Sequence, residues 1–191
     1  MKTVKKKTSV RIPKNVTVLY CDKKNLITFI GPLSVKSLNL KIKLVMIPVS
    51  NLIVVTSLPI DQKSIVDLKN SKKIQGTTIA QIRQVLTEVT YSLVQKLNLV
   101  GVGYRAFSYE NFPNQIYFKL GYSHLVYFKI PPALTVNCLK STNVFIQGNT
   151  SYNLLTQTAA QIRSCRLPEP YKGKGILYDQ ETIILKKGKK I

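Results

Sequence analysis

The residues with the clearest chemical potential lie near the C-terminal end of the sequence. They are Tyr171, Lys172, Gly173, Lys174 and Gly175. Each lysine carries a compact positive charge that neutralises phosphate, and the glycines have no side chain to keep the backbone from a surface. Pro168 and Pro170 precede them. Because proline fixes φ and lacks an N–H donor, we expect an extended, stiff segment that holds Tyr171 outward. The pattern favours binding to a phosphate backbone, and the alternative is a solvated basic loop.

The acidic residues show no arrangement that supports catalysis. They are Asp22, Asp61, Asp67, Glu88, Glu110, Glu169, Asp179 and Glu181. Only Asp179 and Glu181 lie close together in the sequence, and on a strand they would share one face near lysines. This spacing is typical of a local ion pair or a solvated loop rather than of a general acid–base pair. Since the sequence also lacks a nucleophile elbow and a P-loop, we predict that the protein is not an enzyme.

A second glycine-containing block, around Gly101 and Gly103, has a weaker chemical meaning. It resembles the start of a dinucleotide-binding fingerprint, but the third glycine is missing and no helix is expected to follow. We therefore expect a bulge or turn that glycine permits. The adjoining Tyr104 and Arg105 have two interpretations, contact with RNA or packing at the junction between domains.

Metal and disulfide chemistry find little support in the sequence. The three cysteines, Cys21, Cys138 and Cys165, are widely spaced. That spacing fits neither a zinc site nor a disulfide framework, and it favours free thiols in a reducing compartment. The single histidine, His124, has no cysteine nearby, so we expect a structural role for it. We predict neither a metal site nor a cofactor.

The charge of the chain indicates the class of its partner. Its 191 residues include 29 Lys+Arg against 8 Asp+Glu, a formal net charge of +21. Such a surplus of positive charge repels itself in a compact protein, and an anionic partner relieves the repulsion. Nucleic acid is favoured because the cations are spread along the whole chain. A peripheral binder of an anionic membrane surface is the alternative.

One uncharged stretch, residues 44–60, approaches the length of a membrane span. Prolines and polar residues interrupt it, so we expect two buried strands at 44–47 and 52–56, joined by a Pro-Val-Ser-Asn turn. The N-terminal residues contain no apolar signal-peptide core, and no secretory signal is expected.

The remaining elements would position the basic residues within two similar halves. Strand-like runs occur at 16–20, 26–30, 37–45, 97–102, 115–120, 125–130, 134–138 and 144–147. A helical stripe begins near Thr77, where Thr77 or Thr78 would cap the helix, after a polar connection at 61–73. A second stripe runs from Leu155 to Ile162.

A repeated hexapeptide indicates an internal duplication. Residues 78–83 are Thr-Ile-Ala-Gln-Ile-Arg and residues 158–163 are Thr-Ala-Ala-Gln-Ile-Arg, both on predicted helices that follow strands. We predict an α+β fold of two similar small domains, each an antiparallel sheet with one covering helix, plus basic N- and C-terminal extensions. The predicted parts are a basic arm at 1–14, domains at 15–94 and 95–167, and a basic RNA-binding tail at 168–191.

Three blocks of the sequence resemble the ribosomal protein L6 family of the large subunit. Pro-Glu-Pro-Tyr-Lys-Gly-Lys-Gly-Ile at 168–176 fills every position of the family signature. Leu-Val-Gly-Val-Gly-Tyr-Arg-Ala at 99–106 is similar to the opening of the family's second domain, and Gly-Tyr-Ser-His at 121–124 to a third segment. Leu177 departs from the pattern where arginine is common, and the resemblance is loose before Leu97.

The resemblance implies two related domains bound to large-subunit rRNA beside the sarcin–ricin loop, where translational GTPases dock transiently. Neighbouring ribosomal proteins would be further partners. By this likeness Tyr171, Lys172, Gly173, Lys174 and Gly175 would line the RNA. The further RNA-binding candidates are Arg166, Arg163, Tyr104, Arg105, Lys186 and Lys187. The bacterial-type pattern and a composition without tryptophan suggest a mitochondrial ribosome, with a plastid or the bacterial cytoplasm as alternatives.

Overall fold

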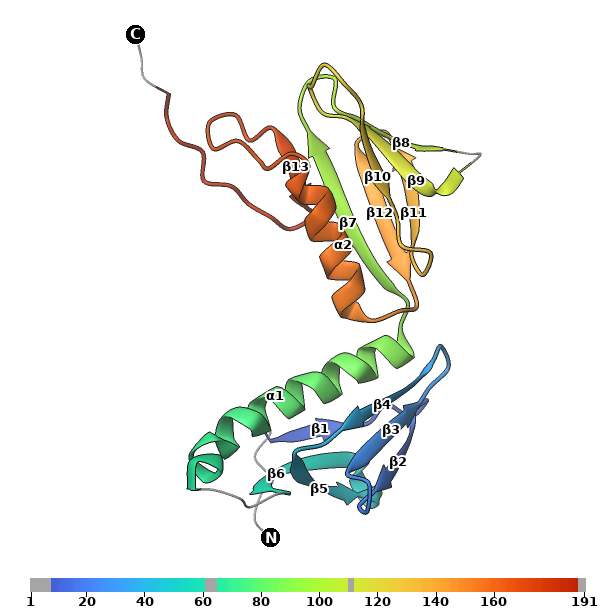
Figure 1. Ribbon diagram of the computed structural model, residues 1–191, viewed down its shortest axis with the longest axis vertical. Helices are drawn as coiled ribbons and strands as arrows, with labels where there is room; N and C mark the ends of the chain where they lie inside the picture. Colours follow the sequence, from blue (N-terminus) through green and yellow to red (C-terminus); the bar gives the residue numbers. More distant parts are fainter. Residues whose placement is uncertain (1–7, 61–64, 110–111, 189–191) are drawn as a thin grey trace. The chain divides into compact units, whose positions relative to one another are not determined.

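The computed structural model describes residues 8–60, 65–109 and 112–188. The chain divides into two compact units, Met1–Tyr91 and Ser92–Ile191, close to the boundary expected after residue 94. Each unit combines antiparallel strands with a helix that packs on them (Figure 1). The predicted α+β fold of two similar sheet domains is therefore confirmed.

The amino-terminal unit contains two three-stranded sheets and a long helix. Its elements are β1 (Ser9–Arg11), β2 (Thr17–Cys21), β3 (Leu26–Ile30), β4 (Val35–Asn39), β5 (Ile42–Ile47), the 3₁₀ turn η1 (Pro48–Ser50), β6 (Leu52–Pro59) and α1 (Ile65–Thr90). The strand orders are β1-β6-β5 and β2-β3-β4, and α1 packs mainly on β6. Alternating side chains such as Ile27 and Phe29 on β3 point into one core, which also contains Ile82 and Val89 of α1.

The carboxy-terminal unit contains a three-stranded sheet, a four-stranded sheet and a shorter helix. Its elements are β7 (Leu93–Val100), β8 (Arg105–Tyr109), β9 (Phe112–Lys119), β10 (Val126–Lys129), β11 (Thr135–Lys140), β12 (Asn143–Gly148), α2 (Tyr152–Ser164) and β13 (Gly175–Tyr178). The strand orders are β10-β9-β8 and β11-β12-β7-β13. Helix α2 lies along β7 and β13 (Figure 1), and Leu155, Ala159 and Ile162 face the core.

The repeated hexapeptide performs the same packing task in both helices. Thr78 and Thr158 are buried, and each hydroxyl donates a 2.8 Å hydrogen bond to the carbonyl four residues earlier. Ile82 and Ile162 are both fully buried in the cores of their own units. The duplication expected from the sequence thus has a structural counterpart in each unit.

The predicted basic arm at 1–14 extends too far along the chain. Strand β1 lies inside it and pairs with β6, and Val10 is buried in the core. Val10 lies between polar neighbours, which is the alternation of a half-buried strand, but the surrounding lysines obscured this pattern. Residues 1–7 lie outside the described residues.

Helix α1 begins earlier than the sequence suggested. It already includes Ile65, so the polar connection predicted at 61–73 is wrong from that residue onward, and its earlier residues lie outside the described part of the chain. Thr77 and Thr78 are helix-interior residues rather than caps. The helix continues through Gly76, where an added Cβ would meet nothing within 4 Å.

The other predicted strands are present, with three differences. The run at 37–45 is divided into β4 and β5, and neither β8 nor β13 was predicted as a separate strand. Strand β13 pairs with β7 in register Ile176 to Leu99, so part of the predicted tail at 168–191 belongs to the sheet of the carboxy-terminal unit.

The uncharged stretch at 44–60 forms a hairpin, as expected. Strands β5 and β6 pair antiparallel, and η1 with Asn51 in a left-handed conformation (φ 50°) makes the turn. Leu44, Ile53 and Val55 are buried in the core. Of the helices within the described ranges, neither is long and apolar enough to cross a membrane.

Candidate nucleic-acid interface

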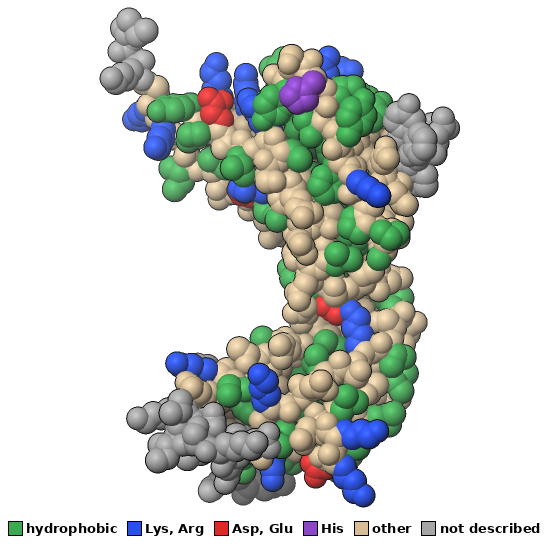
Figure 2. Space-filling model, viewed as in Figure 1, with side chains coloured by type: hydrophobic (Ala, Val, Ile, Leu, Met, Phe, Trp, Pro, Cys, Tyr) green, Lys and Arg blue, Asp and Glu red, His purple; other side chains and the backbone are tan. Residues whose placement is uncertain are grey.

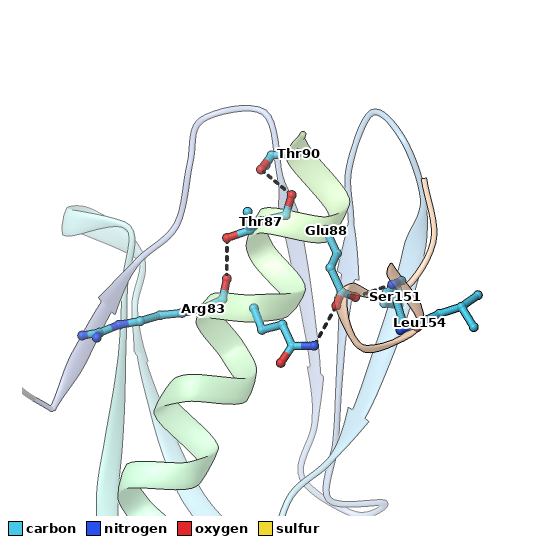
Figure 3. Close-up of polar contacts among 8 residues, drawn as sticks. Arg83, Thr87, Glu88, Thr90, Ser151 and Leu154 are labelled. Carbon is cyan, nitrogen blue, oxygen red and sulfur yellow. Dashed lines mark hydrogen bonds and ion pairs between the residues drawn. The ribbon is translucent and has the colours of Figure 1, made fainter. Parts of the chain in front are cut away.

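Helix α2 leads directly into the segment that carries the lysines and glycines. At its start, the Ser151 hydroxyl caps the helix by accepting a 3.4 Å hydrogen bond from the Leu154 amide (Figure 3). After its last residue, the amides of Cys165 and Arg166 still donate to carbonyls of the final turn, at 3.1 and 3.3 Å. The chain therefore leaves the helix in a fixed direction before it reaches Pro168.

Residues 169–174, here called the basic loop, turn back on themselves. The Glu169 amide donates to the Lys174 carbonyl, and the Gly173 amide donates to the Glu169 carbonyl, both at 2.9 Å. The Lys186 amide donates to the Pro170 carbonyl at 2.8 Å, so the following segment stabilises the loop. The prolines exclude a helix, as expected, but the prediction of an extended segment was wrong because backbone hydrogen bonds close the loop.

The two glycines of this region are required by the closure of the loop. Gly173 has φ of +68°, a left-handed conformation that favours glycine. At Gly175, with φ of +155°, an added Cβ would lie 2.5 Å from the Cα of Pro168. The glycines are thus explained by contacts within the chain, whereas the sequence analysis assigned them to a close approach to an external surface.

The basic loop presents an aromatic ring and positive charge to solvent. Tyr171 is 54% exposed, Lys172 is exposed and Lys174 is partly buried. None of the ion pairs found among the described residues includes either lysine. In Figure 2, blue Lys and Arg side chains gather at the upper left, where Figure 1 places the segments on either side of β13. The lysine charges are therefore available to an external anion.

Arg166 lies in a stack of cationic and aromatic side chains beside the loop. Its guanidinium carbon is 4.7 Å from the centroid of the Tyr122 ring, and the Tyr122 ring stacks on His124 with centroids 5.6 Å apart. The Tyr122 hydroxyl donates to the Cys165 carbonyl at 3.2 Å. Hydrogen bonds with Tyr122, and then with Tyr104, raise the pKa of Arg166. Sequence reasoning omitted Tyr122 and His124 from the site, although the block at 121–124 was the signal that pointed to them.

Tyr104 belongs to the core, so its ring is not available for stacking on RNA. It is 6% exposed, and a Cβ at Gly101 would lie 2.9 Å from its ring. A Cβ at Gly121 would lie 3.1 Å from the same ring. Gly101 and Gly121 have positive φ and make room for Tyr104, which explains Gly101 without any phosphate ligand. Gly103, the other glycine of the block, has φ of +74°, a left-handed conformation that favours glycine. Packing was one of the two interpretations left open for this residue, and the structure shows it within the carboxy-terminal unit.

Arg163 is bound inside the unit by Glu181. Its Nε donates to one carboxylate oxygen of Glu181 at 3.0 Å and its Nη2 donates to the other, which gives a bidentate ion pair. The guanidinium also lies over the Tyr178 ring, 5.5 Å from the centroid. The pair raises the pKa of Arg163 and lowers that of Glu181. Arg163 therefore holds the segment after β13 against α2, rather than offering a free charge.

Asp179 is also paired within the unit. Lys96 lies 2.6 Å from its carboxylate, and Asn98 donates to it at 3.2 Å. The hydrogen bond from Lys96, followed by the one from Asn98, lowers the pKa of Asp179. The two acids that are close in sequence thus have different basic partners, as expected for structural ion pairs rather than for a catalytic pair.

The remaining candidates lie in two separate places. Lys186 and Lys187 are exposed, and the backbone of Lys186 bonds to the basic loop, so these two residues extend its positive surface. Arg105 is exposed on β8, which belongs to the other sheet of the unit. It forms no part of the basic loop.

The cysteines and the acids form no metal cluster within the described ranges of the chain. Cys21, Cys138 and Cys165 are free thiols, and burial raises the pKa of the latter two. The chemistry that the basic loop and its neighbours offer is consequently charge, hydrogen-bond donation and aromatic surface.

Comparison with known proteins gives one consistent family. The family profile described as Ribosomal protein L6 matches residues 100–179. The chain is 43% identical over 125 residues to the large ribosomal subunit protein uL6 of Rhodopseudomonas palustris, which covers 65% of this chain and 68% of the relative. It is 46% identical over 123 residues to the uL6 of Mycoplasma pneumoniae, which covers 64% of this chain and 65% of that protein.

Proposed function

Because the chain belongs to the ribosomal protein L6 family, we propose that it is a structural, non-catalytic constituent of the large ribosomal subunit. It binds rRNA through the basic loop, with Lys186 and Lys187 extending the contact. The relatives carry the name of a large-subunit protein, and the match extends through the loop.

The closed basic loop is the observation that carries this proposal. Tyr171 and Lys172 are exposed on a backbone that is fixed by three hydrogen bonds, from Glu169 to Lys174, from Gly173 to Glu169 and from Lys186 to Pro170. A loop that is already ordered loses little conformational entropy when it binds. Its lysines make sequence-independent contacts with phosphate, the mode by which proteins hold structured RNA in position.

The stack at Arg166 supports a second contact beside the loop. The guanidinium group is planar, stays charged at neutral pH and can form paired hydrogen bonds with phosphate. Stacking on an aromatic ring holds it in one orientation. Since Tyr122 fixes the guanidinium 4.7 Å from its ring, Arg166 would meet RNA with little reorganisation.

The family likeness carries the finer part of the proposal. The contacted rRNA would lie beside the sarcin–ricin loop, with neighbouring ribosomal proteins as permanent partners and translational GTPases as transient ones. In that position the protein would support the docking region of the GTPases without taking part in their chemistry. Protection of the sarcin–ricin loop from chemical probes by the bound protein is the expected result.

The relatives reported above are bacterial, which supports a ribosome of the bacterial type. A mitochondrial ribosome remains our proposal for the compartment, and the bacterial cytoplasm or a plastid is the alternative. Fractionation of the source cells, followed by detection of the protein in the organelle or in the cytoplasm, separates these possibilities.

The alternative is a peripheral binder of an anionic membrane surface. It would use the basic arm together with the uncharged stretch at 44–60, and that stretch is largely folded into β5 and β6, with Leu44 and Ile53 buried. Flotation with anionic liposomes in the absence of RNA tests what remains of this alternative, and we expect the protein to stay in the dense fraction.

The proposal is tested by sedimentation of ribosomal particles on a sucrose gradient. Wild-type protein should sediment with the large subunit, whereas Lys172→Glu/Lys174→Glu should shift to the top of the gradient. A matched control is Lys23→Glu/Lys24→Glu, which changes the charge equally at two exposed lysines of the β2–β3 turn. If the loop variant sediments like the control, the basic loop does not hold the protein on the subunit.

A further inference from the structure

The outer face of sheet β10-β9-β8 has features that neither the core nor the basic loop explains. Its inner face packs into the core through residues such as Ala106, Ile116 and Phe118. Because side chains alternate along a strand, the residues between them lie on the opposite face. Those with described side chains are Arg105, Phe107, Gln115, Tyr117, Lys119, Tyr127 and Lys129.

Three aromatic residues form a continuous row across this face, here called the aromatic row. Phe107 is opposite Tyr117, and Tyr117 is opposite Tyr127 in the strand register. The Phe107 and Tyr117 rings stack with centroids 5.1 Å apart and planes 19° apart. The Tyr127 ring follows at 6.2 Å and 40°. The row therefore presents a stack that ends at Tyr127.

The end of the row is open to solvent. Strand β10 is at the edge of its sheet, and Tyr127 is 66% exposed. The contact between the rings of Phe107 and Tyr117 already stabilises the pairing of β8 with β9. The third ring, that of Tyr127, lies on the edge strand, and its exposed aromatic face is a site on which another ring can stack.

Positive charge lies on both sides of the aromatic row. Arg105 is directly opposite Lys119 on one side, and Lys129 lies opposite Gln115 on the other. Two cations at directly opposite positions of neighbouring strands repel each other. The seven described residues of this face include no acid, so nothing among them offsets the repulsion. An anionic partner would offset it.

We infer that this face is a second RNA-binding surface, on which an unpaired nucleobase stacks against Tyr127 and prolongs the aromatic row. Arg105, Lys119 and Lys129 hold the adjoining phosphates. Stacking of bases on aromatic side chains within a positively charged groove is how proteins bind single-stranded nucleic acid. The inference rests on the proposed function, because it assumes that the protein binds RNA, and it adds a different class of RNA element, an unpaired base.

A binding measurement on the full chain tests the stack. The probes are a short single-stranded oligouridylate and a chain of the same length whose residues are abasic, which keeps the phosphates and lacks the bases. Tyr127→Ala should weaken binding of oligouridylate about tenfold and leave the abasic chain unaffected. Tyr127→Phe keeps the ring and should bind like the wild type. Tyr91→Ala is the matched control, because Tyr91 is also 66% exposed but lies directly after α1, in the other unit.

The outcomes separate this inference from the proposed function. If Tyr127→Ala binds oligouridylate as tightly as Tyr91→Ala does, base stacking on Tyr127 is wrong. The proposed function then still holds, provided that Lys172→Glu/Lys174→Glu no longer sediments with the large subunit. If instead that loop variant sediments with the subunit and Tyr127→Ala binds oligouridylate weakly, the role of the basic loop is wrong and base stacking on Tyr127 holds. If Tyr127→Ala changes only self-association in sedimentation velocity, the face binds a second copy of the chain and the inference is overturned.

Discussion

The two helices share a hexapeptide, yet its last residue has a different role in each. Arg163 on α2 is bound by Glu181 and lies over Tyr178. Arg83, its counterpart on α1, is exposed, and Figure 3 shows its side chain pointing away from Glu88. The buried positions of the motif pack in the same way in both halves. The arginine differs, because only Arg163 holds the segment that follows the basic loop.

The helices also end differently. In α1 the hydroxyls of Thr87 and Thr90 donate to carbonyls of the preceding turn, including that of Arg83, as the helix runs on to Thr90 (Figure 3). Helix α2 ends at Ser164, shortly before Pro168, which cannot continue a helix. Because α2 ends at Ser164, the residues after it are outside the helix and can form the basic loop. In the amino-terminal unit, α1 continues to Thr90, and Tyr91 is the last residue of that unit.

The largest expected effect is common to both halves. Ile82→Ala and Ile162→Ala each remove a fully buried side chain from a core, which should lower the free energy of unfolding of the affected unit by about 2–5 kcal/mol. Denaturant unfolding of the two variants measures this. A loss below about 1 kcal/mol in only one of them would show that the motif does not pack equivalently.

A smaller effect should separate the two arginines. Arg163→Ala removes the bidentate ion pair with Glu181, which is about three-quarters buried on both sides, and should cost about 1–2 kcal/mol. Arg83→Ala changes an exposed side chain and should stay within about 0.5 kcal/mol. Limited proteolysis after β13 should accelerate only in the Arg163 variant. Equal stability of the two variants would remove the contrast between the helices.

The pH dependence of stability should follow the same ion pair. The pKa of Glu181 is lowered in the folded protein, chiefly by hydrogen bonds from Arg163. Its carboxylate therefore stabilises the fold fully above its unfolded pKa of about 4.3, and this contribution is lost as the pH falls through the folded value. In Glu181→Gln the acid-side loss of thermal stability should be shallower. An unchanged profile would mean that Glu181 is not the group responsible.

The smallest expected effect is a gain at Gly76 of α1. A Cβ there meets nothing within 4 Å, and the position is inside the helix, so Gly76→Ala should stabilise the amino-terminal unit by about 0.5–1 kcal/mol. Thr156 of α2 occupies the equivalent place in the other half, and Thr156→Gly should reverse the sign. Thermal unfolding measures both changes. A loss of stability in Gly76→Ala would show that the glycine has a packing role.

The sequence predicted the features that depend on local patterns. Period-two alternation indicated most of the strands, and apolar residues at spacings of three and four indicated the two helices. The repeated hexapeptide indicated the duplication. The start of α1 was missed because the residues before Thr77 are largely polar and include Gly76, which has a low helix propensity. A short stretch of this composition gives no clear helical period.

The sequence predicted which residue types form the candidate site, but it did not predict how these residues are arranged in space. The lysines and Tyr171 were identified from their spacing. The close approach of Gly175 to Pro168 and the burial of Tyr104 depend on how separate segments of the chain pack together in the fold. The pairing of Arg163 with Glu181 likewise joins residues 18 positions apart. The aromatic row was missed because its members come from three strands, and no single stretch of sequence contains it.

The most direct test of the basic loop is the salt dependence of binding to large-subunit rRNA. If about five cations contact phosphate, log K should fall against log salt with a slope of about −4. In Lys172→Gln/Lys174→Gln the slope should be shallower by about 1.5, because two phosphate contacts are lost. Lys23→Gln/Lys24→Gln, with the same net charge, should keep the wild-type slope. A flat response in the wild type, or equal slopes in the two variants, would contradict a phosphate-binding role for the loop.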